Sequence, residues 1–511
     1  MHKSILFVIT IAALTACVRN QPQVIVITSS SPISDPIFLT PTLDIVDNTV
    51  IPPSVIPAAT RYVEQQPMTE EYVVQPGDTL YGIALQHNLS VEAILQLNEL
   101  PDPNILTVGQ IIKLPPLPDE TSAAFNIVPD GRLVRGPGSL QFSVRDFIEK
   151  QSGYIRLASD IVDDKLLSAS EVVERIAVEF SVDSRLLLAL LEYQNNWLTK
   201  SEQQESAKAY PIQGQPSSDG VDRSGLYKQL AWTANQLNRG YYSWKYAGVA
   251  SLELQDGTRL RYIPELNAGT VGVQYLFGQM YDVANWSKAV SADGLFQTYI
   301  GFFGDPFDSA APLLVPAALR QPEFTLPFPQ GQTWFFTGGP HGGWGTGSAW
   351  SAVDFAPPDD RPEGSPLCYV SDFEAVAVTG GIITRSKDGM VLLDVDGDGD
   401  ETTGWVVMYL HIASEGRVQI GTYVQSGDFI GRPSCEGGFS TATHMHIARR
   451  YNGEWMPVNC ELCINFFPAF VMSGWTFYGL TNQEYQGYML HGNEKRIAEQ
   501  GRLTSDNLIS W

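Results

Sequence analysis

The sequence predicts a multidomain protein with a small βααβ domain, a mainly α-helical middle domain and an antiparallel all-β C-terminal domain. A length of 511 residues is sufficient for about three domains. Apolar residues recur at helical spacing between positions 129 and 310, whereas short strand-like runs separated by glycines follow position 330. Proline-rich stretches at 18–70 and 311–330 are typical of linkers between such parts.

The charge balance narrows the range of partners. The chain has 32 basic and 56 acidic residues, which give a formal net charge of −24, and 44% of its residues are hydrophobic. A field of this sign repels nucleic acid and anionic lipid headgroups. We therefore expect no nucleic-acid partner.

The N-terminus has the pattern of an export signal. Lys3 precedes an apolar run over 5–13, which is too short to span a bilayer, and Leu14-Thr15-Ala16-Cys17 follows. These four residues resemble a bacterial lipobox, which implies a signal peptide over 1–16 and lipidation of Cys17. A plain secretory signal is the alternative. We expect a membrane-anchored lipoprotein of a bacterial cell envelope, outside the cytoplasm, that contacts the membrane through its lipid anchor only.

The segment 17–70 is rich in Pro, Thr, Ser and Val and is predicted to be a disordered tether. A compact unit follows over 71–116, with a strand, a helix from Leu80, a second helix over 91–97 and a closing strand. Its landmarks resemble a LysM domain: Gly77-Asp78-Thr79-Leu80, Ile83-Ala84, Asn98 and Gly109-Gln110. The resemblance implies binding of N-acetylglucosamine-containing glycans such as peptidoglycan, with Gly77, Asp78, Thr79, Leu80 and the stretch 106–109 lining the groove.

The middle domain, 129–310, contains four segments that are apolar at helical spacing: 172–180, 185–191, 226–237 and 271–280. The stretch from Phe180 to Gln194, with Leu266-Asn267-Ala268-Gly269-Thr270, weakly resembles lysozyme-like lytic transglycosylases. The position of that family's catalytic acid is occupied here by Gln194, which cannot donate the required proton. Glu192 lies on another side of the helix. We expect a degenerate, lysozyme-like domain that binds glycan or acts as a spacer; activity through Glu192 is the alternative.

The C-terminal domain, 325–511, has the rhythm of antiparallel strands. We expect strands at 375–383, 391–394, 406–411, 422–424, 429–430 and 444–448.

Five of the seven histidines lie in this domain, and four of them accompany an aspartate in its glycine-rich, strand-patterned part: His341, His411, His444 and His446, with Asp354. Residues i and i+2 of a strand share a face, so His444 and His446 can address one ion and its water. Catalytic zinc takes three N or O ligands and keeps one open position. The pattern therefore predicts a catalytic zinc site.

Five motifs in this domain, in this order, resemble the lysostaphin and LytM-type zinc metallopeptidases. They are Gly339-Pro340-His341, Ala352-Val353-Asp354-Phe355, Met408-Tyr409-Leu410-His411, the glycine-turn pattern over 421–431 and Thr443-His444-Met445-His446. The thirteen-residue spacing from His341 to Asp354 resembles the staphylolysin-like branch. The resemblance implies Zn²⁺ ligands His341, Asp354 and His446, and catalytic roles for His411 and His444.

The remaining cysteines are an even number in an oxidising compartment. We favour disulfides between Cys368 and Cys435 and between Cys460 and Cys463; a zinc ribbon at Cys460 and Cys463 is the alternative. Between two predicted strands, the run from Asp394 to Asp400 begins like a Ca²⁺ loop, but position twelve is Trp405 instead of Glu. A solvated acidic turn is the favoured interpretation, and a Ca²⁺-stabilised hairpin is the alternative.

Two functions are consistent with these features. The first is a zinc-dependent endopeptidase that hydrolyses peptide cross-links of peptidoglycan and is held on the wall by LysM. The second is a non-catalytic peptidoglycan-binding scaffold, or an activator of other wall hydrolases. The retention of all five metal-site and catalytic residues favours the enzyme.

Overall fold

A computed structural model describes residues 70–511 except 77, 88, 90, 96, 99, 101–104, 117, 218, 309–313, 363, 459–467, 481–482 and 502–504. The predicted signal peptide, Cys17 and the predicted tether up to residue 69 lie outside the described residues. Within the described part, no helix has the length and apolar character needed to cross a bilayer.

The first unit has the predicted βααβ order, with β1 (Glu70–Val73), α1 (Leu80–Gln86), α2 (Val91–Leu95) and β2 (Ile111–Leu114). The strands β1 and β2 pair antiparallel. Thr79 begins α1 by accepting the backbone N–H of Gly82 at its Oγ1. A small core of its own, which includes Leu80, Ile83, Ile94 and Ile112, holds the unit together.

The middle region is mainly helical, as predicted. Its helices are α3 (Asp130–Leu133), α4 (Val144–Glu149), α5 (Ala169–Phe180), α6 (Ser184–Asn195), α7 (Glu205–Ala209), α8 (Leu226–Tyr246), α9 (Ala268–Gly278), α10 (Val283–Ala289) and α11 (Leu295–Phe303). Two short hairpins, β3 (Ser159–Val162) with β4 (Lys165–Ser168) and β5 (Ser251–Glu253) with β6 (Arg259–Arg261), complete the region.

Local signals explain where the long helices begin and how closely they pack. Ser168 and Glu171 form a capping box at the start of α5. Asp183 caps α6. Where α8 crosses α9, a Cβ on Gly240 would lie 2.5 Å from Cβ of Tyr275, so only a glycine allows this approach.

The C-terminal region is built on a nine-stranded antiparallel sheet, as the sequence predicts in type. The strand order is β13 (Tyr423–Val424), β10 (Gly381–Lys387), β11 (Met390–Asp394), β12 (Trp405–Leu410), β15 (Met445–Tyr451), β8 (Ala352–Ala356), β7 (Thr333–His341) and β21 (Leu508–Ser510), with β16 (Glu454–Trp455) beside β15. The run 375–383, predicted as one strand, is divided into β9 (Ala375–Val376) and β10, because β9 pairs instead with β14 (Phe429–Gly431).

A second sheet was missed by the sequence reading. It contains β17 (Val471–Met472), β18 (Trp475–Leu480), β19 (Gln483–His491) and β20 (Glu494–Ile497) in that order. Strand β19 lies against β7, so this sheet extends towards His341.

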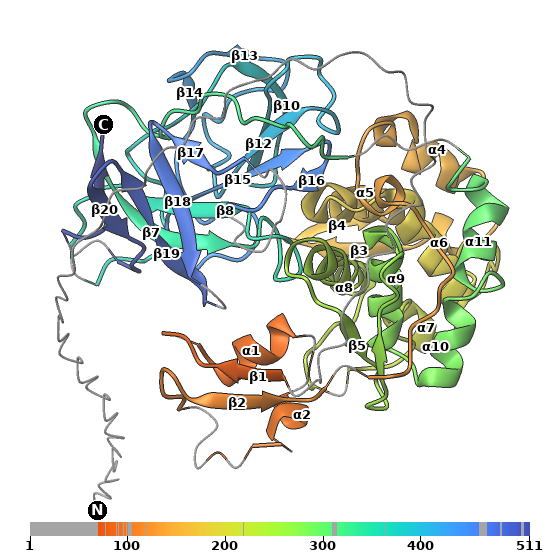
Figure 1. Ribbon diagram of the computed structural model, residues 1–511. Helices are drawn as coiled ribbons and strands as arrows, with labels where there is room; N and C mark the ends of the chain where they lie inside the picture. Colours follow the sequence, from red (N-terminus) through yellow and green to blue (C-terminus); the bar gives the residue numbers. More distant parts are fainter. Residues whose placement is uncertain are drawn as a thin grey trace, which may run out of the picture. The chain divides into compact units, whose positions relative to one another are not determined.

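The central strands of the large sheet are buried on both faces, and successive residues belong to two different cores. In β12, Val407 and Tyr409 pack into the core of the C-terminal region. Val406, Met408 and Leu410 instead join the core of the helical region, which α5, α6, α8 and α9 dominate. The helical region, drawn in yellow and green in Figure 1, therefore covers one face of this sheet.

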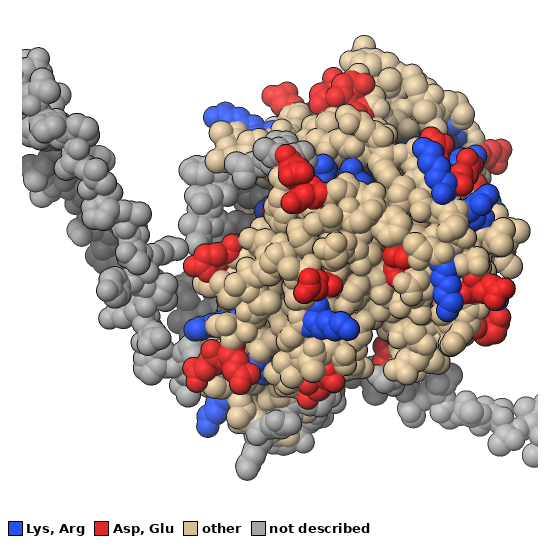
Figure 2. All heavy atoms as spheres, turned by 90° about the vertical axis from the view of Figure 1, so that its right-hand side faces the viewer, with Lys and Arg blue, Asp and Glu red and all other residues tan. Residues whose placement is uncertain are grey.

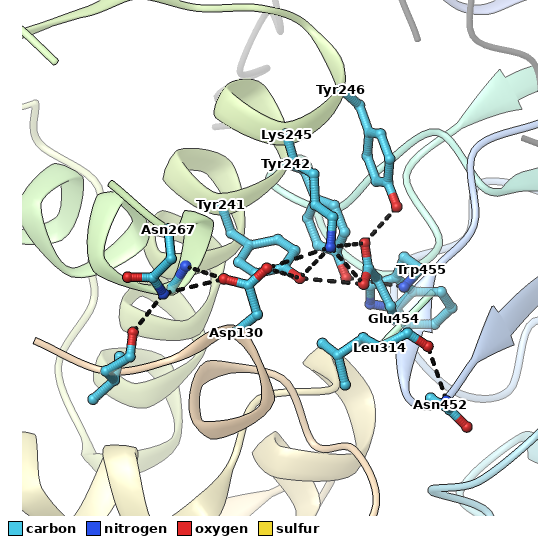
Figure 3. Close-up of polar contacts among 12 residues, drawn as sticks. Asp130, Tyr241, Tyr242, Lys245, Tyr246, Asn267, Leu314, Asn452, Glu454 and Trp455 are labelled. Carbon is cyan, nitrogen blue, oxygen red and sulfur yellow. Dashed lines mark hydrogen bonds and ion pairs between the residues drawn. The ribbon is translucent and has the colours of Figure 1, made fainter. Parts of the chain in front are cut away.

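A buried polar network joins the same two regions (Figure 3). The carboxylate of Glu454, on β16, has no exposed surface. It lies 2.9 Å from Nζ of Lys245 and accepts hydrogen bonds from the hydroxyls of Tyr241 and Tyr246, all three on α8. Asp130 contacts the same ammonium group at 3.4 Å. A second ion pair between the regions links Arg135 and Glu401 at 2.9 Å.

The helical side of the molecule presents both signs of charge. Figure 2 shows acidic and basic side chains lying close to one another, with broad uncharged areas between them.

Candidate metal centre

The structure brings His341, Asp354 and His446 together at one point of the large sheet. Oδ1 of Asp354 lies 3.3 Å from Nε2 of His341 and 3.3 Å from Nδ1 of His446, and these two nitrogens are 2.9 Å apart. A tetrahedral zinc site with bonds of about 2.0–2.1 Å places its ligand atoms about 3.3 Å from one another. The spacing of the three donors is therefore close to that of a zinc site.

The outward nitrogens of both histidines are held by backbone carbonyls. Nδ1 of His341 lies 2.8 Å from the oxygen of Gly339, and Nε2 of His446 lies 3.1 Å from the oxygen of Gly343. A carbonyl only accepts, so in the neutral rings both protons point outward and both inward nitrogens present lone pairs. Oδ1 of Asp354 is buried and has no hydrogen-bond donor among the described residues. Three converging lone pairs fit a cation.

Strand register places these donors. His446 on β15 is paired with Asp354 on β8 on one side and with Leu410 on β12 on the other. His341 ends β7, where an irregularity in the register with β8 turns its side chain towards Asp354. On β15, Met445 and Ile447 belong to the core of the C-terminal region, whereas Ala448 belongs to the core of the helical region. His446 lies on the same face of the strand as Ala448. The metal site is therefore on the face of the sheet that the helices cover.

His411 and His444 lie beside this group, with ring centroids 4.5 Å apart. Nδ1 of His411 lies 3.1 Å from the oxygen of Glu436, and Nδ1 of His444 lies 2.8 Å from the oxygen of Ala442, which leaves both Nε2 atoms for the site. His411 follows the last residue of β12 with a φ of +63°, an uncommon backbone conformation that turns its ring out of the strand's alternation.

The electrostatics of the pocket depend on burial and on the aspartate. Burial lowers the pKa of His411 to about 3, so its ring is neutral near neutral pH. Burial opposes a charge on Asp354, but the neighbouring His341 and His444 hold the pKa of this carboxyl well below its usual range. The site therefore combines a fixed negative charge with a neutral base.

The five residues open into a cavity of about 680 Å³. Its rim includes Leu367, Tyr369 and the segment 439–443, and the side chain of Phe439 is 88% exposed there. Cys368 and Cys435 form the disulfide that we expected, and it ties these two parts of the rim together. Cys460 and Cys463 lie outside the described residues, so their pairing stays a prediction.

Sequence reasoning missed Tyr485 of β19. Its ring stacks on that of His341 with centroids 4.2 Å apart and an interplanar angle of 20°. Its φ of +67° is uncommon for a residue with a side chain. Tyr485 follows His341 by more than a hundred residues in an unrecognised sheet, so no spacing signal pointed to it.

Comparisons with known proteins agree with these features. Residues 72–115 match the family described as LysM domain, and residues 126–316 match the family described as LasA, N-terminal domain. Protease LasA of Pseudomonas aeruginosa is 26% identical over 325 residues, which cover 59% of this chain and 70% of LasA. This chain is similar to LasA and contains a LysM domain.

Other similarities are shorter. N-acetylmuramoyl-L-alanine amidase XlyB of Bacillus subtilis is 51% identical over 45 residues, 9% of this chain and 14% of XlyB. Among solved structures, the deep-sea M23 metalloprotease pseudoalterin is 24% identical over 35% of this chain and 96% of its own, with a TM-score of 0.27. The lysostaphin catalytic domain of Staphylococcus simulans is 25% identical over 23% and 80%, with a TM-score of 0.17.

Within the LysM domain, the predicted glycan-binding residues differ in their exposure. Thr79 is exposed and Asp78 is half-buried. Oδ2 of Asp78 accepts the hydroxyl of Tyr72 and the backbone N–H of Gln75. The side chain of Leu80 is only 3% exposed and belongs to the core, so it can offer a glycan little beyond its backbone. Gly77 lies outside the described residues.

The candidate acid positions of the helical region are engaged in structural contacts. Oε1 of Gln194 accepts the hydroxyl of Tyr281 at 2.7 Å. Glu192 is 8% exposed and accepts the backbone N–H groups of Leu198 and Thr199 and the hydroxyl of Thr199. Glu192 therefore fixes the turn after α6. The lysozyme-like resemblance of the region stays a prediction.

Proposed function

We propose that this protein is a zinc-dependent endopeptidase that hydrolyses peptide cross-links of peptidoglycan. The observation that carries the proposal is the convergence of Oδ1 of Asp354, Nε2 of His341 and Nδ1 of His446, with both outward ring nitrogens held by carbonyls. The three donors line a cavity together with His411 and His444, so a zinc ion held by them would be accessible to water and substrate, as a catalytic site requires.

His341, Asp354 and His446 would hold the ion. When bound there, zinc would polarise the scissile carbonyl and lower the pKa of a water molecule towards neutrality. His411 and His444 present Nε2 to the same space, and one of them accepts the proton of the attacking water. As an imidazolium, that ring then stabilises the developing oxyanion or protonates the leaving amine.

The rest of the chain would bring this site to its polymer. A LysM domain at 72–115 would bind the glycan strands, through Asp78 and Thr79 with the adjoining Gly77 and the backbone of Leu80. Lipidation of Cys17 would keep the protein in the cell envelope, and the tether would extend its reach. The binding of wall glycan concentrates the peptidase on its substrate without any new contact at the metal site.

Zinc content and peptide cleavage together test the proposal. Wild-type protein should carry one zinc per chain and cleave cross-linked muropeptides. His341→Ala and Asp354→Ala each remove one of three ligands and should lose the metal. His411→Ala and His444→Ala should keep it while the cleavage rate falls about 100-fold or more.

His491→Ala is the matched control, because His491 contacts Trp475 on the second sheet and should leave both readouts unchanged. A metal-replete and active His341→Ala variant would contradict the ligand assignment. A zinc-free wild-type chain that pellets with wall material would instead support a scaffold or activator.

A further inference from the structure

The loop between β11 and β12 brings three carboxylates together away from the metal centre. One carboxylate oxygen from each of Asp394, Asp396 and Asp398 lies within 4.8 Å of the other two. Asp394 is the last residue of β11, whereas Asp396 and Asp398 lie on the exposed part of the loop. Three negative charges at this spacing repel one another unless a cation or protons lie between them.

Asp394 is the decisive member of this group, which we call the acidic loop site. Its side chain has no exposed surface. Its Oδ2 accepts the backbone N–H of Gly399 at 2.8 Å, whereas its Oδ1 is buried and has no hydrogen-bond partner among the described residues. A buried carboxylate oxygen without a donor is costly. An acidic turn that is simply solvated does not explain why this oxygen is removed from water.

The arginines that reach the loop pair with Glu401 and not with the three aspartates. Glu401 accepts the guanidinium groups of Arg385 and Arg135 at 2.8 and 2.9 Å. In the described part of the chain, no ion pair joins Lys, Arg or His to Asp394, Asp396 or Asp398. Burial and the facing carboxylates raise the pKa of Asp394 to about 7. The described residues therefore supply no ion-paired positive charge to the acidic loop site.

We propose that the acidic loop site binds Ca²⁺. Calcium takes six to eight oxygen ligands at about 2.3–2.6 Å, so two of its ligand atoms can be up to about 5 Å apart. The three carboxylates meet this limit, and carbonyl and water oxygens would complete the shell. Mg²⁺ requires a tighter octahedron at about 2.0–2.1 Å and is the poorer fit. Gly397 and Gly399, with φ of +76° and +83°, give the loop the turns it needs to surround an ion.

The position of the loop gives the ion a structural role. Glu401, in the same loop, forms the ion pair with Arg135 of the helical region. Gly404 donates its N–H to Oδ1 of Asn452, and Nδ2 of Asn452 donates to the carbonyl of Leu314. An ion that orders the loop would therefore strengthen the joint between the helical region and the large sheet.

Calcium binding to the full chain, loaded with one equivalent of zinc after passage over a chelating resin, tests this proposal. Titration calorimetry with CaCl₂ should give one site with a Kd below about 1 mM, and saturation should raise the Tm. The variant Asp396→Asn with Asp398→Asn should bind at least tenfold more weakly. Both side chains are on the exposed part of the loop, so the variant should fold.

The matched control is Asp293→Asn with Glu415→Gln, which removes two exposed carboxylates elsewhere and should bind Ca²⁺ like the wild type. Absence of a Ca²⁺-dependent heat and Tm shift at about 5 mM would overturn the proposal, as would wild-type affinity in the double Asp variant. Equal affinity for Mg²⁺ would overturn the assignment to calcium. Zinc content is measured in parallel, so failure of the zinc site is distinguished from failure of this one.

Discussion

The backbone carbonyl of Gly343 lies 3.1 Å from Nε2 of His446, and the loop that supplies this carbonyl is held from its other side by Asn235 of α8. Oδ1 of Asn235 accepts the N–H of Gly347 at 2.8 Å, and its Nδ2 donates to Oγ1 of Thr346 at 3.2 Å. Arg239 adds a bond to the same hydroxyl at 2.9 Å. A helix of the middle region thus supports the carbonyl that orients a candidate metal ligand.

Asn235→Ala should weaken zinc binding about tenfold or more, because partners that orient a metal ligand commonly contribute 10- to 100-fold in affinity. Competition with a chromophoric chelator measures the change. Gln236→Ala, one residue further along α8, is the control and should bind zinc like the wild type. An unchanged affinity in Asn235→Ala would show that the loop keeps its position without the helix.

Low pH should weaken the ion pairs that Glu401 forms with Arg135 and Arg385. Burial favours the neutral carboxyl, but the charges of Arg135 and Arg385 prevail and lower the pKa of Glu401 to about 2. Because the pKa of Glu401 is lower in the folded state, its ionised carboxylate stabilises the fold at pH values above about 4.5, the pKa in the unfolded chain. This contribution to the free energy of unfolding, about 3 kcal/mol, is lost as the pH falls from about 4.5 towards 2. The free energy of unfolding of wild type and Glu401→Gln should therefore differ at pH 7 and converge near pH 2. A constant difference would contradict the pairing.

Glu454→Gln should destabilise the protein by about 3–5 kcal/mol, the usual effect of removing one partner of a buried ion pair. The change leaves the ammonium group of Lys245 beside Asp130 alone, at 3.4 Å. Calorimetry should show a lower Tm, whereas the exposed Glu415→Gln should leave the Tm unchanged. A Glu454→Gln variant as stable as the wild type would mean that the network in Figure 3 adds specificity instead of stability.

Cys368→Ser with Cys435→Ser should lower the free energy of unfolding by about 4 kcal/mol, since the disulfide closes a long loop between residues 67 positions apart. Zinc content should stay at one per chain, because the metal donors lie on strands. Denaturant unfolding and metal analysis of the double variant check both statements. Loss of zinc would show that the rim of the cavity also holds the donors in place.

The helical region should not cleave glycosidic bonds, because Gln194 occupies the acid position and Glu192 is committed to the turn after α6. Mass spectrometry of glycan strands incubated with the full-length His341→Ala variant, which should lack peptidase activity, should show no new reducing or anhydro ends. A muramidase digest is the positive control. New ends that disappear in Glu192→Gln would contradict this prediction.

Much of the candidate site was predictable because its signals are local. The i and i+2 spacing of His444 and His446 and the Gly339-Pro340-His341 motif are features of short segments, and the structure brings all five predicted residues together. The carbonyls of Gly339 and Gly343 were not predictable, because backbone atoms leave no trace in residue identity. The stacking of Tyr485 depends on a contact between distant strands.

In the fold, too, local features were predictable from the sequence, whereas features that depend on distant contacts were not. Strands such as β12, with the sequence Trp405-Val-Val-Met-Tyr-Leu410, are apolar at every position, which indicates burial on both faces. The sequence does not say what covers the second face, and the helical region does so here. The prolines around 311–330 suggested a separation between two domains at a point where the core is in fact continuous. Continuity of this kind depends on side chains far apart in the sequence.

That continuous core limits how such a chain can be recombined in evolution or in the laboratory. A fusion that carried the large sheet without the helices would expose Met390, Leu392, Val406, Met408 and Leu410 to water. A surface of that kind promotes aggregation. The LysM domain has a core of its own that ends at Leu114. Exchange of modules should therefore succeed at about residue 118 and fail near residue 314, because only the second cut divides a core.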